Sequence, residues 1–201
     1  RRLTWQKITL QYFMPTEQFN LAIETTSRCG SISLGCEGDL LATFKLLQPR
    51  RHNIDLMPAV NELCRRHNAS PHQLGQVFVS VGPGSFTGLR IAIATAKMLS
   101  IVGGARLVAV PTIDVLAENG PDDAEHLAVC LNLKRDSMYA CLFDRDGGAW
   151  RATTAAALTT LEQLLDAAAR PLTIVADALG PGVDLDAHDE LRLLPPQAAQ
   201  P

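Results

Sequence analysis

The sequence has little charge and no strong excess of either sign. Charged residues make up 19% of the 201 residues, and the formal net charge is −3. A domain that binds nucleic acid on its own usually carries a basic face and a high pI, so this balance argues against one and leaves only a local basic patch open. The 47% of hydrophobic residues predicts a folded chain with a substantial core, in one large or two small domains.

Long apolar runs are also missing. No segment reaches the roughly 18 continuous apolar residues that a membrane span requires. Residues 1–18, RRLTWQKITLQYFMPTEQ, contain no apolar stretch that ends in a small-residue cleavage site, so we do not expect a signal peptide. We interpret them as an N-terminal extension. It is either disordered or results from a start of translation wrongly assigned upstream of Met14. Alternatively, the chain is a fragment.

Cysteines and histidines are few and scattered. The five cysteines contain no C-x-x-C pair and are odd in number, which predicts reduced, mostly buried thiols in a cytoplasmic protein: Cys29, Cys36, Cys64, Cys130 and Cys141. The five histidines contain no H-x-x-x-H or H-E-x-x-H pair that could hold a metal from one helix. His52 precedes a predicted helix and is most simply a solvated or capping residue. We expect no metal site.

The first half of the chain alternates strand and helix signals. Residues 19–25, 30–35 and 40–46 read as three strands joined by tight turns, with Glu37 to Asp39 between the last two. A helix with an apolar face is predicted over 53–67, a buried strand over 76–82, a second helix over 87–102 and a strand over 106–110. The order is three strands, helix, strand, helix, strand.

The second half begins the same order again. Strands are predicted over 126–133, 137–144 and near 150–153, followed by a helix over about 160–169 and a strand over 172–177. Two copies of one order predict a duplicated two-lobe α/β fold, with an N-terminal lobe of residues 19–120 and a C-terminal lobe of residues 121–201. We expect the C-terminal lobe to be incomplete, because residues 177–201 lack the helices and strand of a full copy.

A glycine-rich loop, GPGSFTG, separates a predicted strand from the second helix. It lacks the Gly-Lys-Ser/Thr ending of a P-loop, and Gly82, Gly84 and Gly88 have one residue too many for the dinucleotide fingerprint. Two interpretations stay open. The loop and helix N-terminus could receive an anion, or the loop could simply turn the chain and cap the helix through Ser85 or Thr87.

Glu24 ends the first predicted strand beside Thr25, Thr26 and Ser27. A carboxylate at this position could orient a metal-bound phosphate, and a polar turn at the strand end explains it equally well. The hairpin that contains Arg135, Asp136 and Tyr139 needs no function to explain its charges.

Four segments, IETTSRCGSISL, RHNIDLMPAVNEL, VGPGSFTGLRIAIATAKML and LNLKRDSMYACLFD, together resemble the bacterial TsaB (YeaZ) family in this order and at these separations. The GPGSFTGLRI stretch is highly specific to that family and its relatives, and the likeness runs from about Phe19 to Ala176. The resemblance implies a two-lobe actin and hexokinase-like fold, also called ASKHA or ribonuclease H-like, which agrees with the repeated order of elements.

The resemblance also implies a non-catalytic role. Members of the family bind the catalytic paralogue TsaD and, with TsaC and TsaE, install threonylcarbamoyl on the adenosine beside the anticodon of tRNAs that read codons beginning with A. TsaD and TsaE are thus the implied partners, a homodimer is possible, and tRNA is contacted only through the complex. No cofactor is expected in the isolated chain. ATP binding is possible only within the complex.

The family pairs with its paralogue through the helix predicted here over 53–67. Apolar residues of this helix could therefore belong to the core or to the partner interface, and the second helix offers a further candidate: Ile54, Leu56, Met57, Val60, Leu63 and Leu89. The catalytic paralogues bind metal through a histidine pair on this helix, where the present sequence offers only His52.

The loop is then interpreted as a vestigial phosphate loop: Glu24, Thr25, Gly82, Gly84, Ser85 and Gly88. The family usually has aspartate where Glu24 stands, and Asn132 or Lys134 falls where another aspartate is common. Two other classes of function stay open. One is an ATPase of the actin-like superfamily or a metallopeptidase of the glycoprotease type, and the other is a homodimeric partner-binding protein outside tRNA modification.

Overall fold

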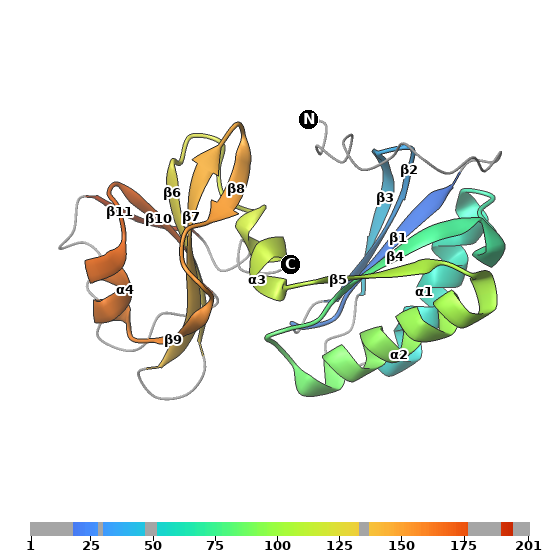
Figure 1. Ribbon diagram of the computed structural model, residues 1–201. Helices are drawn as coiled ribbons and strands as arrows, with labels where there is room; N and C mark the ends of the chain where they lie inside the picture. The colour runs from blue at the N-terminus through green and yellow to red at the C-terminus, as the bar shows by residue number, and fades with distance from the viewer. Residues whose placement is uncertain (1–17, 28–29, 47–51, 133–136, 177–189, 195–201) are drawn as a thin grey trace. The chain divides into compact units, whose positions relative to one another are not determined.

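The computed structural model describes residues 18–27, 30–46, 52–132, 137–176 and 190–194. Contacts within the chain divide it into two compact units, one of residues 1–81 and 85–110 and the other of residues 82–84 and 111–201. Each unit is built on a β-sheet of its own (Figure 1). Except for Gln18, the extension predicted over residues 1–18 lies outside the described residues.

The first unit contains a mixed five-stranded sheet. Its strands are β1 (Phe19–Glu24), β2 (Ser31–Cys36), β3 (Asp39–Lys45), β4 (Leu74–Ser80) and β5 (Arg106–Val110). They lie in the order β3-β2-β1-β4-β5, with β1 to β3 antiparallel and β4 and β5 added parallel to β1. Glu37 and Gly38 have positive φ values of 52° and 92°, a backbone conformation that suits a two-residue hairpin turn.

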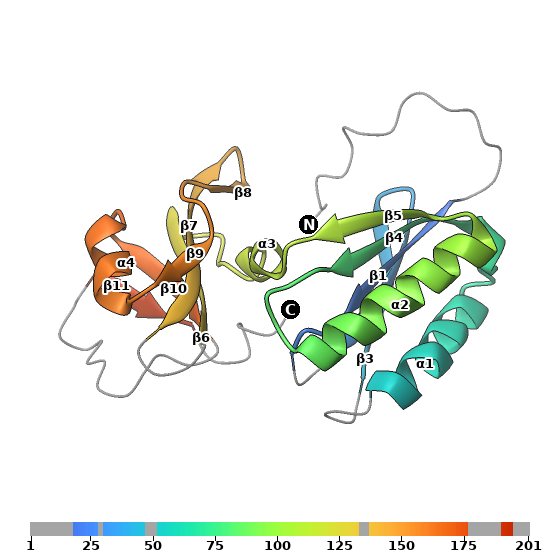
Figure 2. The ribbon, with the colours of Figure 1, turned by 60° about the horizontal axis from the view of Figure 1, so that its bottom comes forward.

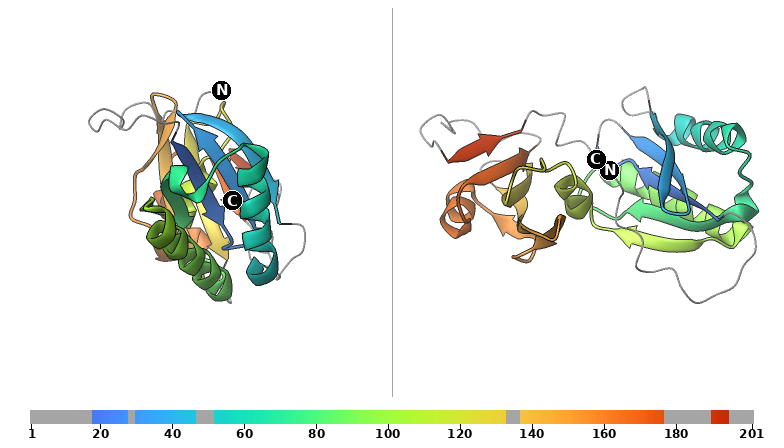
Figure 3. Two further views of the ribbon diagram at one scale, coloured as in Figure 1. Left: turned by 90° about the vertical axis from the view of Figure 1, so that its right-hand side faces the viewer. Right: turned by 90° about the horizontal axis from the view of Figure 1, so that it is seen from above.

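Two helices cover one face of this sheet. α1 (His52–Arg66) and α2 (Phe86–Gly103) lie side by side (Figures 2 and 3), and the short 3-10 helix η1 (Pro71–Gln73) connects α1 to β4. The core between helices and sheet contains Leu21, Ile32 and Val77 from the strands and Leu63 and Leu99 from the helices. Alternate strand residues point to this core because successive side chains of a strand face opposite sides.

The second unit repeats the strand order of the first. Its strands are β6 (His126–Asn132), β7 (Met138–Asp146), β8 (Ala149–Ala152), β9 (Ala157–Thr159), β10 (Leu172–Ala176) and β11 (Leu191–Leu193). The order β8-β7-β6-β10-β11 matches β3-β2-β1-β4-β5, again with three antiparallel strands and two parallel additions, while β9 pairs with β7. The predicted duplication of an α/β topology is thus confirmed.

Helices on both faces cover the second sheet. α3 (Thr112–Ala117) contributes Ile113 and Leu116 to the core on one face, where Leu127 of β6 also points. α4 (Leu161–Ala167) contributes Leu164 to the core on the other face, together with Leu172. Two separate apolar cores are therefore built on the alternating residues of the same strands.

The structure differs from the sequence prediction at two places. The sequence placed the lobe boundary near Pro121, whereas the contacts group residues 111–120, and with them α3, with the second unit. The sequence also predicted no strand after residue 177, whereas β11 pairs with β10 and gives the second sheet a fifth position in its main order. Residues 177–189, which connect β10 to that strand, lie outside the described residues.

Candidate functional site

The carboxyl end of β1 carries a buried acidic side chain. Glu24 is only 7% exposed, and its Oε1 accepts a hydrogen bond from the backbone N–H of Thr26. Its Oε2 is buried and has no hydrogen-bond partner. A buried carboxylate oxygen without a partner is unusual, because an unmet hydrogen bond in the interior costs free energy.

The hydroxyl of Thr25 is used within the chain. Thr25 is fully buried and donates a hydrogen bond of 2.8 Å to the backbone carbonyl of Gly88 in the first turn of α2. The helix approaches so closely that a Cβ built on Gly88 would lie 1.8 Å from the Thr25 carbonyl oxygen. Glycine is therefore required at position 88 for packing.

Ser85 caps α2, which is one of the two interpretations left open by the sequence. Its Oγ accepts a hydrogen bond of 3.2 Å from the backbone N–H of Gly88, and its own N–H donates to the Thr26 carbonyl at 2.7 Å. A side chain that accepts from the third residue of a helix is the usual N-cap arrangement. The Thr25 hydroxyl and the Ser85 backbone N–H thus both fix the start of α2 to the end of β1.

The two earlier glycines of the loop belong to the other unit by their contacts. Gly82 has a positive φ of 105°, and its carbonyl accepts a hydrogen bond of 2.9 Å from the N–H of Thr112. Gly84 is grouped with it. Of the six residues predicted as a vestigial phosphate loop, Glu24, Thr25, Ser85 and Gly88 belong to the first unit, and the contacts of Gly82 and Gly84 group these two with the second.

Half of the predicted partner interface is core. Leu56, Val60 and Leu63 are at most 2% exposed, because they point from α1 into the core of their own unit. The sequence could not separate core from interface at these positions, and their burial removes them from the surface. Ile54, by contrast, is 53% exposed, and Met57 and the α2 residue Leu89 are partly exposed.

The outward side of α2 carries large apolar residues next to the exposed Arg90 and Lys97. The sequence named this helix as a candidate face through Leu89, but it did not single out these residues. Four large residues are exposed along this helix, from its first turn to its last: Phe86 at 67%, Met98 at 42%, Ile101 at 84% and Val102 at 60%. Arg90 lies over the Phe86 ring, with its guanidinium carbon 4.1 Å from the ring centre. Buried Gly88, Ala92 and Ala96 occupy the opposite side of the helix.

By length and composition, α2 is the one described helix that could cross a membrane. Here its side of small residues packs against the sheet of the first unit, mainly against β4. The helix also ends at Gly104, whose φ of 79° is the left-handed conformation that favours glycine after a helix.

Glu62 and two arginines form an ion-pair cluster on the exposed side of α1. Glu62 accepts hydrogen bonds from Arg65 and Arg66, with Oε1 2.7 Å from the Arg66 Nε. These guanidiniums, Arg65 first, lower the pKa of Glu62 to about 2. Exposed pairs of this kind contribute little to stability, so the cluster is a solvated helix surface.

The remaining titratable groups form no metal site among the described residues. Among the described residues, no three His, Cys, Asp or Glu side chains converge as metal ligands would. His126 Nδ1 and Asp144 Oδ1 lie 2.7 Å apart on neighbouring strands. Burial raises the pKa of the Cys64 and Cys141 thiols, and Cys36, Cys64, Cys130 and Cys141 form no disulfide.

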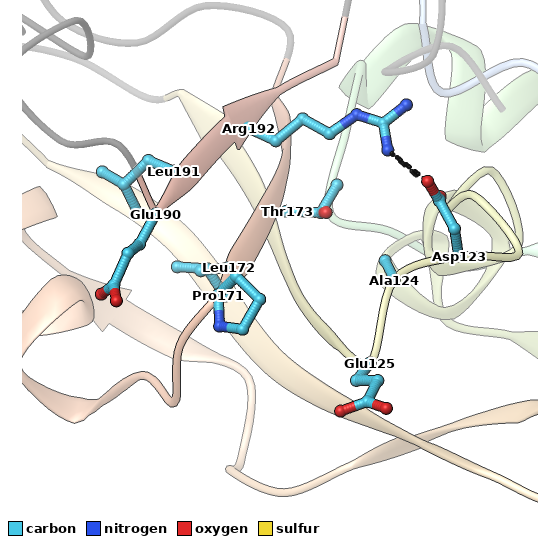
Figure 4. Close-up of a pocket in the computed structure, with 9 residues that line it drawn as sticks. All are labelled: Asp123, Ala124, Glu125, Pro171, Leu172, Thr173, Glu190, Leu191 and Arg192. Carbon is cyan, nitrogen blue, oxygen red and sulfur yellow. Dashed lines mark hydrogen bonds and ion pairs between the residues drawn. The ribbon is translucent and has the colours of Figure 1, made fainter.

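A shallow pocket lies beside β10 and β11 in the second unit (Figure 4). Arg192 and Asp123 form an ion pair across it, with Nη1 3.0 Å from Oδ2. The carboxylates of Glu125 and Glu190 point away from this pair (Figure 4). Both partners of the pair are more than half exposed, so it is a surface feature of the sheet edge. The Arg135–Asp136 turn lies outside the described residues.

Fold and loop geometry together define a class of protein: a duplicated α/β chain in which a glycine loop fixes a long helix to the end of the first strand. Residues 46–183 match the sequence model of the family described as TsaD, tRNA N6-adenosine threonylcarbamoyltransferase. The match covers more than half of the chain, and the chain belongs to this family.

Curated relatives carry the name tRNA threonylcarbamoyladenosine biosynthesis protein TsaB. The chain is 30% identical over 128 residues to that of Bacillus subtilis, covering 64% of this chain and 56% of the relative. It is 28% identical over 133 residues to that of Escherichia coli, covering 65% and 57%. The chain thus spans a little over half the length of these relatives.

Two solved structures from Pseudomonas aeruginosa share the fold. A protein described as similar to peptidase YeaZ superposes with a TM-score of 0.70 and 26% identity over 78% of this chain and 74% of that chain. YeaZ itself gives a TM-score of 0.65 and 26% identity over 71% and 68%. The resemblance to the TsaB (YeaZ) family is therefore confirmed.

Proposed function

We propose that this chain is a non-catalytic partner subunit of the complex that forms N6-threonylcarbamoyladenosine on tRNA, and that it binds and supports TsaD. Its membership of the family and the names of its TsaB relatives support a role in this modification. TsaE is a further partner in this proposal, tRNA is contacted through the complex, and ATP is used only there. The proposed location is the cytoplasm.

The uncovered apolar face of α2 is the observation that carries the proposal. Phe86, Met98, Ile101 and Val102 are large apolar side chains exposed on one helix, and Ile54 is exposed on the neighbouring α1. Large exposed apolar side chains that gather on one helix often mark an interaction site. Arg90 and Lys97 are exposed on the same side of α2 and would lie among them. We propose this face in place of Leu56, Val60 and Leu63, which are buried.

The loop geometry fits a supporting role. The Thr25 and Ser85 hydroxyls, which a phosphate would need as partners, bond to the backbone around Gly88. The loop therefore holds α2 in place and presents its outward face.

Single aspartate substitutions test the interface. We expect Ile101→Asp to weaken binding to TsaD more than tenfold, because it places a charge in an apolar contact. The matched control is Leu158→Asp in the second unit, where Leu158 is 69% exposed on β9; it should bind as the wild type does. Affinity is measured by calorimetry on variants with unchanged circular dichroism. Wild-type affinity of a folded Ile101→Asp chain would place the interface elsewhere.

One observation favours a second candidate function, an ATPase of the actin-like superfamily. Glu24 Oε2 is buried and lacks a partner at the end of β1, where a carboxylate could orient a metal-bound phosphate. If the isolated chain hydrolyses ATP with magnesium and Glu24→Gln abolishes this activity, the enzyme is the better account. If the chain hydrolyses ATP no faster than buffer alone, the result supports the partner-subunit proposal.

A further inference from the structure

Two cations lie in the middle of the outward side of α2. Four exposed residues follow one another at intervals of four, three and four along the sequence, which places them on one side of the helix: Arg90, Ala94, Lys97 and Ile101. Exposed Phe86 precedes them in the first turn. Arg90 and Lys97 therefore lie between large apolar side chains and not at an end of the helix.

Neither cation has a negative partner among the residues that the structure describes. No residue of α2 is acidic. The guanidinium carbon of Arg90 lies 4.1 Å from the centre of the Phe86 ring, and neither Arg90 nor Lys97 forms an ion pair with a described residue. The two arginines of α1, by contrast, are both paired with Glu62. The described part of the chain thus leaves the two charges of α2 uncompensated.

A partner that covers this side of α2 also covers both charges. Phe86 is 67% and Ile101 is 84% exposed, and a surface that packs against both of them encloses the cations between them. Removing a charge from water costs a large free energy unless a group of opposite charge replaces the water. The long apolar stems of the two side chains add to the contact. The surface that fits is therefore apolar at its ends and acidic in its middle.

Given the proposed function, on which this inference rests, we propose that the surface of TsaD that contacts α2 carries two carboxylates, one for Arg90 and one for Lys97. Seven residues separate the two cations, so their backbones lie about 10 Å apart along the helix and the carboxylates are spaced similarly. Attraction between surfaces of opposite charge also raises the rate of association.

The phosphate backbone of an RNA fits this side of α2 less well. Nucleic acid is bound mainly through many contacts between cations and phosphates, and α2 offers two cations. The formal net charge of the whole chain is −3. A phosphate backbone would also leave the exposed Ile101 and Phe86 without apolar partners.

Charge reversal on the full chain tests the proposal. Arg90→Glu and Lys97→Glu should each weaken binding to TsaD by about tenfold or more, mainly through slower association, and the wild-type affinity should fall as NaCl rises from about 50 to about 500 mM. Arg106→Glu is the matched control, because exposed Arg106 lies opposite Gln76. The next residue of β4, Val77, points into the core under the helices, so Arg106 points away from them. Surface plasmon resonance measures both rates on variants with unchanged circular dichroism.

A carbodiimide cross-link identifies the predicted carboxylates. The reagent activates a carboxylate, and a lysine amine in contact with it then displaces the reagent and forms an amide. Lys97 is the one lysine of α2, so we expect an amide between its Nζ and an aspartate or glutamate of TsaD, located by mass spectrometry. Lys97→Arg keeps the positive charge and should bind as the wild type does without forming this cross-link.

The outcomes distinguish this proposal from the proposed function. If Ile101→Asp weakens binding to TsaD while both charge reversals bind as the wild type does at every salt concentration, the partner subunit stands and the acidic surface is wrong. If the reversals remove binding of tRNA to the isolated chain and leave the affinity for TsaD unchanged, the cations contact phosphate instead. If the folded wild type does not bind TsaD at all, both proposals fail.

Discussion

At Gly88, the close approach of α2 to the end of β1 leaves no room for a side chain. Alanine normally stabilises a helix relative to glycine by about 1 kcal/mol. Here the added Cβ would lie 1.8 Å from the Thr25 carbonyl oxygen. We expect Gly88→Ala to lower the free energy of unfolding by about 2–4 kcal/mol, in the range of substitutions that force strain into a core.

Urea unfolding followed by circular dichroism measures this change. Thr87→Ala is the matched control, because Thr87 is exposed in the same turn and should change stability by less than about 0.5 kcal/mol. A Gly88→Ala chain as stable as the wild type would show that the helix can move away from β1 without cost.

The thiols of Cys64 and Cys141 should be inert in the folded protein. Burial raises the pKa of both groups, and the Cys141 Sγ lies 3.2 Å from the Thr154 carbonyl oxygen. Because the thiolate is the reactive form, raising the pH from 7 to 9 should accelerate labelling of partly exposed Cys36 and leave these two unlabelled. Mass spectrometry after alkylation identifies the labelled residues, and fast labelling of Cys64 in the native state would contradict its burial.

The raised pKa values of the Cys64 and Cys141 thiols determine how the free energy of unfolding changes with pH. A thiol whose pKa is raised by folding keeps its proton longer in the native state than in the unfolded state. Its contribution to stability is therefore lost as the pH rises above the unfolded pKa of about 8.5. We expect the free energy of unfolding to decline above this pH, and to decline less steeply in Cys64→Ala; equal slopes would contradict the assignment.

Within α1, neighbouring apolar residues have different roles. Leu56 is 1% exposed and Ile54 is 53% exposed. We expect Leu56→Ala to destabilise the chain by about 2–4 kcal/mol, because it removes buried atoms and leaves a cavity. Ile54→Ala is the control and should change stability by less than about 0.5 kcal/mol. Denaturant unfolding compares the two, and similar losses for both would place Ile54 in the core.

The β7–β8 hairpin is fixed to the segment before β6 by one arginine. Arg145 donates to the Pro121 and Ala124 carbonyls at 2.8 and 2.9 Å, and its guanidinium carbon lies 4.1 Å from the Trp150 ring centre. We expect Arg145→Ala to destabilise the second unit by about 1–3 kcal/mol, since it leaves partly buried carbonyls without partners.

Arg151 on the same hairpin supplies the control for this change. It forms an ion pair with Asp146, and both side chains are more than 60% exposed. Exposed pairs contribute about 0–1 kcal/mol, so Arg151→Ala should change the melting temperature very little. If Arg145→Ala and Arg151→Ala had the same melting temperature, the contacts of Arg145 would contribute no more to stability than an exposed ion pair.

How much the sequence predicts depends on the length of each element. The five-residue β5 was predicted with the bounds it has, and α1 and α2 to within one residue at each end, because long or strongly apolar segments carry a clear period. α3, β9 and β11 contain six, three and three residues, too few for a period to show. At the candidate site, the sequence predicted capping of α2 by Ser85 as one of two interpretations of the glycine loop.

The rest of the site depends on contacts that the sequence does not display. Apolar residues surround most of α2, so the pattern alone does not say which side the sheet covers. The buried glycine and alanines settle this in three dimensions and leave Phe86 and Ile101 outside. Likewise, nothing local to Glu24 indicates that one of its carboxylate oxygens is buried without a partner.

For the whole molecule, the repeated strand order and the family match describe a duplicated α/β protein of the TsaD family. Within the first unit, the outward face of α2 is proposed to bind TsaD.

The most direct test of the central claim is co-elution of this chain with TsaD from the same organism. Size-exclusion chromatography with light scattering, run with and without ATP, gives the mass of any complex. We expect a complex that contains both chains and that is lost with Ile101→Asp and retained with Leu158→Asp. Separate elution of two folded proteins under both conditions would contradict it.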